Sequence, residues 1–281
     1  KYDDFNLDNV PTGRALLMLA QQSQPDKEKY QKAADLLWKQ IENQPKTNEG
    51  GYWHKKRYPF QMWLDGLFMC EPFAAEYSKI FNKPEHFNDI AKQFELVHNN
   101  IVDKKTGLVY QAWDESKEIA WADKQTGTSP TIWGRGIGWY MIALVETLDY
   151  FSKSHPKYKV LAGYLNQIAK NVNQYKSESG LWYQVADKPE KFGNYVESSA
   201  SGMIIYAFAK GADKGYLPSS YKAAAKKSAT KKSAPKKASP KNLMAKGAIS
   251  GLVIQALKTM GQDKMDEVVF KKIVNLLKNE K

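Results

Sequence analysis

Residues 121–140 combine residue types that can bind a sugar and protonate it. The stretch holds three tryptophans, one aspartate, one arginine and four glycines. Because Asp123 closely follows Trp121, a carboxyl group is expected beside an indole face. Aromatic faces suit the C–H surface of a sugar ring, whose reacting oxygen or carbon needs a proton donor. The stretch therefore indicates carbohydrate chemistry; tryptophans in the core and glycines at helix contacts are the alternative explanation.

A helix is expected directly after this loop. Ser129 and Pro130 fit an N-cap and a first-turn proline, and an apolar pattern continues to about Tyr150. Hydrophobic spacing and starting prolines predict further helices over residues 9–23, 25–44, 59–81, 84–101, 156–175 and 194–212, and two amphipathic helices within 252–277.

The segments between these helices form a repeat. Copies start at Gly51, Gly107 and Gly180. Each copy has a glycine, an aromatic strand-like piece, a polar loop and a helix with small residues. Helical hairpins of this kind cannot bury their apolar faces alone, so they stack side by side. The pattern predicts an all-α toroid with a pocket at one rim, where the loops around Asp65, Asp123 and Lys191 meet.

Composition limits the classes of protein. With 281 residues, 42% of them hydrophobic, the chain can form a single domain over residues 1–281. No apolar run approaches the roughly 20 residues of a membrane span. No signal-peptide core is present in the sequence, so cytoplasmic and periplasmic locations both stay open. The lone Cys70 lies among apolar residues, and the four histidines lack metal-ligand spacing, so we expect no metal ion and no cofactor.

Residues 222–241 carry eight lysines and no acidic residue, which is two-thirds of the net charge of +12. Alanine and lysine favour helix in the first units, but Pro235, Pro240 and the missing apolar residues argue against a buried face. We expect an exposed low-complexity segment. Polyanion binding is an alternative, although the segment lacks interleaved aromatic residues and the chain lacks nucleic-acid motifs, so no nucleic-acid partner is expected.

Three blocks, residues 51–69, 121–140 and 193–202, together resemble glycoside hydrolase family 105, the unsaturated rhamnogalacturonyl hydrolases, and the related family 88 glucuronyl hydrolases. The resemblance runs from about Asn9 to Leu217. It implies an (α/α)6 barrel, either complete or lacking part of its ring at the N-terminus or after residue 217. It also implies removal of a terminal 4,5-unsaturated uronic acid from small lyase-generated oligosaccharides, as in bacterial pectin degradation.

The resemblance places the general acid/base on Asp123 and the second acidic residue of the pocket on Asp65. A carboxyl group held neutral would protonate C4 of the substrate, and as a carboxylate it would then deprotonate water. Burial near an indole and near Asp65 would raise the pKa of Asp123. Substrate contacts are expected from Trp121, His54, Gln111, Arg135, Lys191 and Tyr195. At Gln111 the family more often has histidine, so a shift in substrate orientation or preference is expected.

Each of these residues also has a structural explanation. Asp65 could bond a backbone amide or pair with Arg57, His54 and Arg135 could brace loops, and Lys191 could be solvent-exposed. A carbohydrate-binding protein without turnover, and a glucuronyl hydrolase acting on glycosaminoglycan fragments, are the alternative functions.

Overall fold

Helical hairpins make up the described part of the chain, which in this computed structural model comprises residues 2–22 and 25–230. The 3-10 helices are η1 Tyr2–Asp4, η2 Leu7–Asn9, η3 Pro84–His86 and η4 Asn173–Tyr175. The strands are β1 Gln61–Trp63 and β2 Ala112–Asp114, and the α-helices are α1 Gly13–Ala20, α2 Lys27–Glu42, α3 Leu64–Ile80, α4 Phe87–Ile101, α5 Gly134–Leu148, α6 Pro156–Val172, α7 Ser198–Asp213 and α8 Ser220–Thr230. No helix of this described part is long and apolar enough to cross a bilayer.

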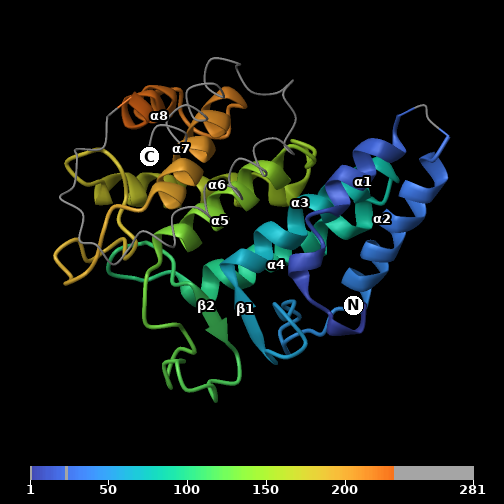
Figure 1. Cartoon of the computed structure of the whole chain (residues 1–281), viewed down its shortest axis with the longest axis horizontal. Coiled ribbons are helices and arrows are strands. Elements are labelled where there is room, and N and C mark those ends of the chain that lie inside the picture. Colours follow the sequence, from blue (N-terminus) through green and yellow to red (C-terminus); the bar gives the residue numbers. More distant parts are fainter. Residues whose placement is uncertain (1, 23–24, 231–281) are drawn as a thin grey trace, which may run out of the picture. The chain divides into compact units, whose positions relative to one another are not determined.

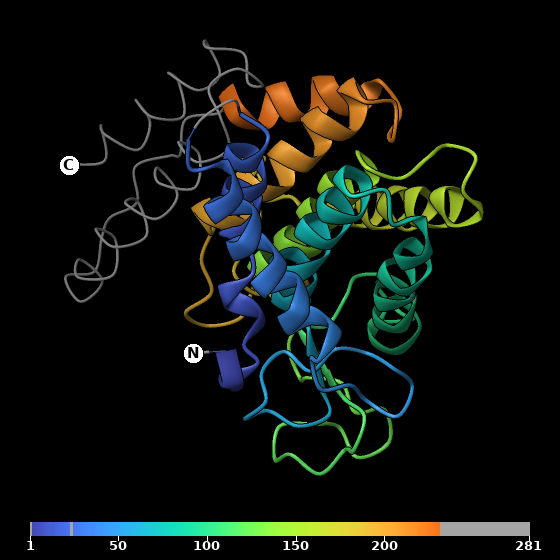
Figure 2. The same cartoon turned by 90° about the vertical axis from the view of Figure 1, so that its right-hand side faces the viewer.

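Consecutive helices pair as hairpins: α1 with α2, α3 with α4, α5 with α6, and α7 with α8. The first helix of each hairpin also packs against the first helix of the next, so α1, α3, α5 and α7 form an inner row (Figures 1 and 2). On the other side of this row α4 packs against α6. The predicted all-α architecture of stacked hairpins is therefore confirmed, with four hairpins among the described residues.

Helix α5 is apolar nearly all round because it packs against α3, α6 and α7. In α5, 13 of 15 residues are buried. Close packing depends on glycine: a Cβ on Gly138 would stand 2.7 Å from the Cβ of Met203 in α7. At this position the glycine of the central stretch serves helix packing, as the alternative explanation held.

A buried ionic network ties the inner row together. The carboxylate of Glu146 in α5 accepts hydrogen bonds from Arg14 of α1 (3.0 Å), from Lys210 of α7 (2.5 Å) and from the Tyr206 hydroxyl. Arg14 also binds Glu76 of α3 (2.8 Å). Four inner helices thus contribute to one network around a carboxylate that is almost fully buried.

Three inner helices begin later than predicted. The helix expected from Pro59 begins at Leu64, because residues 61–63 pair antiparallel with residues 112–114 as β1 and β2. The helix expected from Ser129 begins at Gly134, because the hydroxyl of Ser129 accepts a hydrogen bond from the Ala112 N–H (3.2 Å) and extends the pairing of β2. The helix expected from residue 194 begins at Ser198.

The repeat of strand-like pieces is confirmed with one shift of register. Isolated β-bridges close the three copies at Lys46–Tyr52, Val102–Val109 and Lys176–Trp182. In these bridged turns the glycines with positive φ are Gly50 (+93°), Gly107 (+66°) and Gly180 (+79°). The first copy therefore starts at Gly50 and not at Gly51, since the left-handed conformation that favours glycine falls on residue 50.

The start of the lysine-rich segment is helical, as predicted. Within α8, Ala225 and Ser228 are buried, and the Tyr221 ring packs edge-on against Phe208 at 4.8 Å. The prediction that this segment has no buried face is wrong for these residues, because small side chains let α8 lie against α7. The remainder of residues 222–241, from 231 onward, and the helices expected within 252–277 lie outside the described residues.

Candidate active site

The inner helices all start at the same end of the helix bundle, and β1 and β2 lie at that end too (Figure 1). In three helices that start there, the first backbone N–H donates a hydrogen bond to the backbone carbonyl of a loop residue. The acceptor is His54 for η2 (3.1 Å), Gln111 for α3 (3.0 Å) and Gln184 for α5 (2.9 Å). His54, Gln111 and Gln184 each stand four residues after the glycine of a repeat copy. The repeat thus places three equivalent polar side chains between successive inner helices. Sequence reasoning found the first two and missed Gln184, although Gln184 stands as far from Gly180 as Gln111 does from Gly107.

Two carboxylates hold equivalent positions in this repeat, each as the second residue of its helix. The amide Nε2 of Gln111 donates to Oδ2 of Asp65 in α3. One repeat earlier, Nε2 of His54 lies 3.3 Å from Oδ1 of Asp8 in η2, and Nζ of Lys55 lies 2.6 Å from its Oδ2. Asp8 was not predicted as a site residue. The signal was present, since Leu7-Asp8 begins η2 as Leu64-Asp65 begins α3.

Burial raises the pKa of the Asp65 carboxyl above its ordinary value, and the nearby charge of Asp8 adds to the rise. The Gln111 hydrogen bond and the Arg135 guanidinium act in the opposite direction, but burial prevails. Arg57, the alternative partner of Asp65, lies over the Tyr58 ring at 4.9 Å. The partly buried Asp65 therefore favours its neutral form more than an exposed aspartate does.

An aromatic stack borders Asp65. The His54 ring stacks on Trp63 at 4.7 Å, and Tyr58 also stacks on Trp63, at 5.0 Å. Burial lowers the pKa of His54 to about 4 despite the Asp8 carboxylate, so the imidazole is neutral near pH 7. A neutral ring beside a carboxylate acts as a hydrogen-bond donor, and its stacking partner Trp63 is only partly buried.

Arg135 supplies a cation whose charge acts on Asp65. Its guanidinium lies over the Trp133 ring at 5.0 Å, and its Nη2 lies 3.7 Å from Oε1 of Glu197. Glu197 is the N-cap of α7, where its Oε2 accepts from the Ala200 N–H at 2.5 Å. Glu197 was not predicted; its signal is an acidic residue immediately before a helix rich in small residues. Arg135 is thus held between the starts of α5 and α7.

Buried polar atoms without a hydrogen-bond partner gather at this end of the described residues. They include His54 Nδ1, Gln111 Oε1, Trp133 Nε1, Arg135 Nε and Gln184 Oε1. Buried polar groups in folded proteins are nearly always paired, and each unpaired one costs about 1–3 kcal/mol. Such a concentration is expected where a ligand with many hydroxyl or carboxylate groups supplies the missing partners.

Asp123 does not belong to this cluster. It is exposed in a turn, where its Oδ1 accepts hydrogen bonds from the Thr126 N–H (2.8 Å), the Thr126 hydroxyl (2.9 Å) and the Gln125 N–H (2.9 Å). The hydrogen bonds from the Thr126 backbone and side chain, followed by that from Gln125, lower the pKa of Asp123. The prediction of a desolvated carboxyl with a raised pKa at Asp123 is therefore wrong.

The same turn occurs elsewhere in the chain. Residues 103–107 read Asp-Lys-Lys-Thr-Gly and residues 123–127 read Asp-Lys-Gln-Thr-Gly. In the first turn Oδ2 of Asp103 accepts from the Thr106 N–H (2.9 Å) and from its hydroxyl (2.6 Å). Both turns close with a glycine of positive φ. The turn thus needs an aspartate to pair its own backbone, independently of any chemistry.

The other predicted substrate-contacting residues lie on loops at the same end. Trp121 is partly buried, whereas Lys191 and Tyr195 are exposed. The side chain of Asn194 anchors the loop of Lys191 by donating to the carbonyl of Val185 (2.9 Å), which forms a β-bridge with the residue before α5. Within residues 2–22 and 25–230, no hydrogen bond or ion pair joins these three side chains to Asp65. Core packing of Tyr195 is excluded by its exposure.

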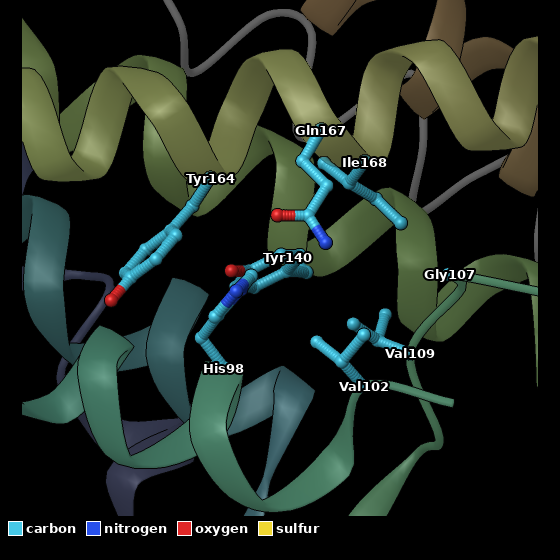
Figure 3. Close-up of a pocket in the computed structure, with 8 residues that line it drawn as sticks. All are labelled: His98, Val102, Gly107, Val109, Tyr140, Tyr164, Gln167 and Ile168. Atoms are coloured by element: carbon cyan, nitrogen blue, oxygen red, sulfur yellow. The ribbon is translucent and has the colours of Figure 1, made fainter. Parts of the chain in front are cut away.

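A small cavity between α4, α5 and α6 lies apart from this cluster (Figure 3). The His98 ring stacks on Tyr164 at 3.8 Å, and the buried hydroxyl of Tyr140 has no hydrogen-bond partner. Val102, Val109 and Ile168 add apolar surface, and Gly107 and Gln167 complete the lining. None of the predicted site residues lines this cavity, so it is not the candidate site.

The row of helical hairpins with a carboxylate-bearing polar end is an architecture shared with helical-barrel glycoside hydrolases. The chain belongs to Glycosyl Hydrolase Family 88, whose family profile matches residues 1–242. A second profile, the Family of unknown function (DUF6088), matches residues 220–281. The predicted resemblance to families 105 and 88 is confirmed.

Known proteins agree with this membership. A family 105 glycoside hydrolase of C. acetobutylicum ATCC 824 has a similar structure, with 43% identity, a TM-score of 0.79, and a match covering 82% of this chain and 63% of that one. The unsaturated rhamnogalacturonyl hydrolase YesR of Bacillus subtilis (strain 168) is 27% identical over 208 residues, 72% of this chain and 57% of YesR. An unsaturated 3S-rhamnoglycuronyl hydrolase of Formosa agariphila is 26% identical over 159 residues, 55% of this chain and 41% of its own length. The chain thus spans less than two-thirds of each of these proteins.

Proposed function

We propose that the protein is a glycoside hydrolase that removes a terminal 4,5-unsaturated uronic acid from lyase-generated oligosaccharides. The observation that carries this proposal is the partly buried Asp65 carboxyl, whose pKa is raised by burial and which interacts with the charges of Asp8 and Arg135. Protonation of an alkene carbon needs an acid that stays neutral near the working pH. A guanidinium suits the carboxylate of the uronic acid. Membership of family 88 supports the same reaction class.

In the proposed reaction, neutral Asp65 donates its proton to C4 of the double bond, which leaves positive charge at C5 and the ring oxygen. Water then bonds to C5 and gives a proton to the Asp65 carboxylate, which restores the acid. The resulting hemiketal opens and releases the rest of the oligosaccharide, so no glycosidic bond is attacked directly. Asp8, held by His54 and Lys55, lies where its negative charge stabilises the cationic transition state.

This proposal moves the acid/base role, first expected for Asp123, to Asp65. Asp65 takes the acid/base role, and Asp123 holds a turn. The Trp63 indole is already stacked with His54 and Tyr58, so Trp121, Lys191 and Tyr195 remain the proposed contacts for the rest of the substrate. Two relatives are named for rhamnogalacturonyl and rhamnoglycuronyl substrates. We therefore propose the unsaturated rhamnogalacturonan disaccharide as the preferred substrate.

The test is the loss of ultraviolet absorbance as the conjugated double bond is consumed. Unsaturated disaccharides of rhamnogalacturonan, hyaluronan and heparin type form the panel, and calorimetry on the same sugars measures binding. We expect turnover, with the highest kcat/KM on the rhamnogalacturonan disaccharide. Binding without turnover would identify a carbohydrate-binding protein, and highest turnover of hyaluronan or heparin sugars would move the substrate to glycosaminoglycan fragments. Absence of both binding and turnover would overturn the proposal.

Replacement of Asp123 tests whether this residue holds a turn and leaves the acid/base role to Asp65. We expect Asp123→Asn to retain kcat within about threefold, because the asparagine oxygen can accept the same turn hydrogen bonds. Asp123→Ala loses that acceptor and should lower the melting temperature, as should the matched Asp103→Ala in the equivalent turn. The measurements are the absorbance assay and thermal melts. A loss of about a hundredfold or more in Asp123→Asn at unchanged melting temperature would return the acid/base role to Asp123.

A further inference from the structure

The Gln111 side chain is held between the starts of two inner helices. Its backbone carbonyl accepts the first N–H of α3 at 3.0 Å, and its Nε2 donates to Oδ2 of Asp65. Its Oε1 is buried and reaches Gly136, the third residue of α5, where a Cβ would stand 2.1 Å from it. The amide is therefore confined by α3 on one side and by α5 on the other.

Gly136 is what leaves room for this amide. The residue is buried within a helix, where alanine is ordinarily favoured over glycine. A methyl group at this position meets the far end of the flexible Gln111 side chain, followed by Cδ1 of Leu64 at 3.3 Å. The added atom would thus displace the amide from Asp65 at little cost to the helix itself.

The direction of the hydrogen bond decides which oxygen of Asp65 carries the acid proton. An amide nitrogen donates hydrogen bonds and does not accept them. While Nε2 donates to Oδ2, that oxygen is an acceptor, and the proton of the neutral acid resides on Oδ1. A histidine could reverse its role on titration, whereas glutamine keeps one role at every pH. The charged or titratable groups around Asp65 are Asp8 of η2 with its partners His54 and Lys55, and Arg135 of α5 with its partner Glu197.

We propose that Gln111 is a positioning residue that fixes the transferable proton on Oδ1 of Asp65, and that Gly136 is the position that permits it. Delivery of this proton to a substrate rests on the proposed function, but the contact between Gln111 and Asp65 does not. The test therefore needs one measurement that is independent of turnover.

That measurement is a titration of the Asp65 side-chain carbon by NMR with ¹³C-labelled aspartate, assigned with Asp65→Asn. Because the amide stabilises the charged carboxylate, its loss raises the Asp65 pKa further. We expect this rise in Gln111→Ala and in Gly136→Ala. Gly163→Ala is the matched control, since a Cβ at Gly163 meets nothing within 4 Å. An unchanged Asp65 pKa in both variants would overturn the proposal.

Kinetics supply the second measurement. We expect Gly136→Ala to lower kcat about tenfold and to move the alkaline limb of the pH–rate profile upward. When Gly136→Ala is added to Gln111→Ala, kcat should change by no more than about twofold, because the amide that the methyl group displaces is already absent. A full Gly136→Ala effect in the Gln111→Ala variant would show a separate role of the glycine and would refute the proposed link. If the NMR shifts occur while even the unaltered protein consumes no unsaturated sugar, the positioning role stands and the proposed function fails.

Discussion

Asp65→Asn is expected to lower kcat on the unsaturated disaccharide by about 10³-fold, within the range known for loss of a general acid/base. Asparagine has the size of aspartate, and its oxygen can still accept the hydrogen bond from Gln111, but it has no proton to deliver to C4 and cannot accept one from water. The fold should be unchanged, because Asp65 lies in the first turn of α3 and no buried ion pair depends on it. The measurements are the absorbance assay and a thermal melt.

The pH dependence follows from the direction of the shift. Burial raises the pKa of Asp65, and the acid must be neutral to start the reaction, so activity is present below this raised pKa and falls as the pH passes above it. Asp8→Asn is the informative companion variant. It removes a negative charge that raises the Asp65 pKa, so the alkaline limb should move to lower pH. Retention of more than about a tenth of wild-type kcat in Asp65→Asn would contradict the assignment.

The hairpin architecture could be predicted because apolar spacing and proline mark individual helices locally. The helix predicted from Pro156 begins there, and the helix predicted to end at residue 101 ends at Ile101. The starts of the inner helices could not be predicted in this way. Pro59 and Ser129 have the local features of helix starts, but pairing with other segments prevails. Residues 61–63, just after Pro59, pair with residues 112–114 some fifty residues later, and Ser129 bonds to Ala112 of β2.

The chemical character of the site could be predicted, but not the assignment of its acids. Asp65 and Asp123 both follow a tryptophan by two residues. Their difference is burial, which depends on the packing of α3 against η2 and α5 and is absent from the local sequence. The repeated Asp-Lys-x-Thr-Gly turn was a usable local signal that Asp123 serves its own backbone. Asp8 was missed because its helix is a single short turn, too brief to show a hydrophobic period.

Glu146→Ala is expected to cost about 3–5 kcal/mol of the free energy of unfolding, the range for breaking a buried ion pair on one side. Burial acts to raise the pKa of Glu146, but Lys210 and Arg14 lower it by more, so the carboxylate is charged at neutral pH. Its removal takes away the carboxylate that Lys210 and Arg14 share, leaving Lys210 with Asp149 (2.7 Å) and Arg14 with Glu76 (2.8 Å), and it opens a cavity beside Tyr206. Urea unfolding followed by far-UV circular dichroism measures the loss.

The pH dependence of this loss distinguishes charge from packing. A carboxylate with a lowered pKa stabilises the folded state above its unfolded pKa, and this contribution disappears as the pH falls through the folded value. The difference in the free energy of unfolding between wild type and Glu146→Gln should therefore become smaller as the pH is lowered to and below 4.5, the ordinary pKa of glutamate. Asp213→Asn breaks the exposed pair with Lys222 (2.6 Å) and serves as the control, with no measurable change expected. If this difference in the free energy of unfolding stays constant over that pH range, the network stabilises the inner row by shape and hydrogen bonding. A contribution from charge would have to titrate with the carboxyl group that carries the charge.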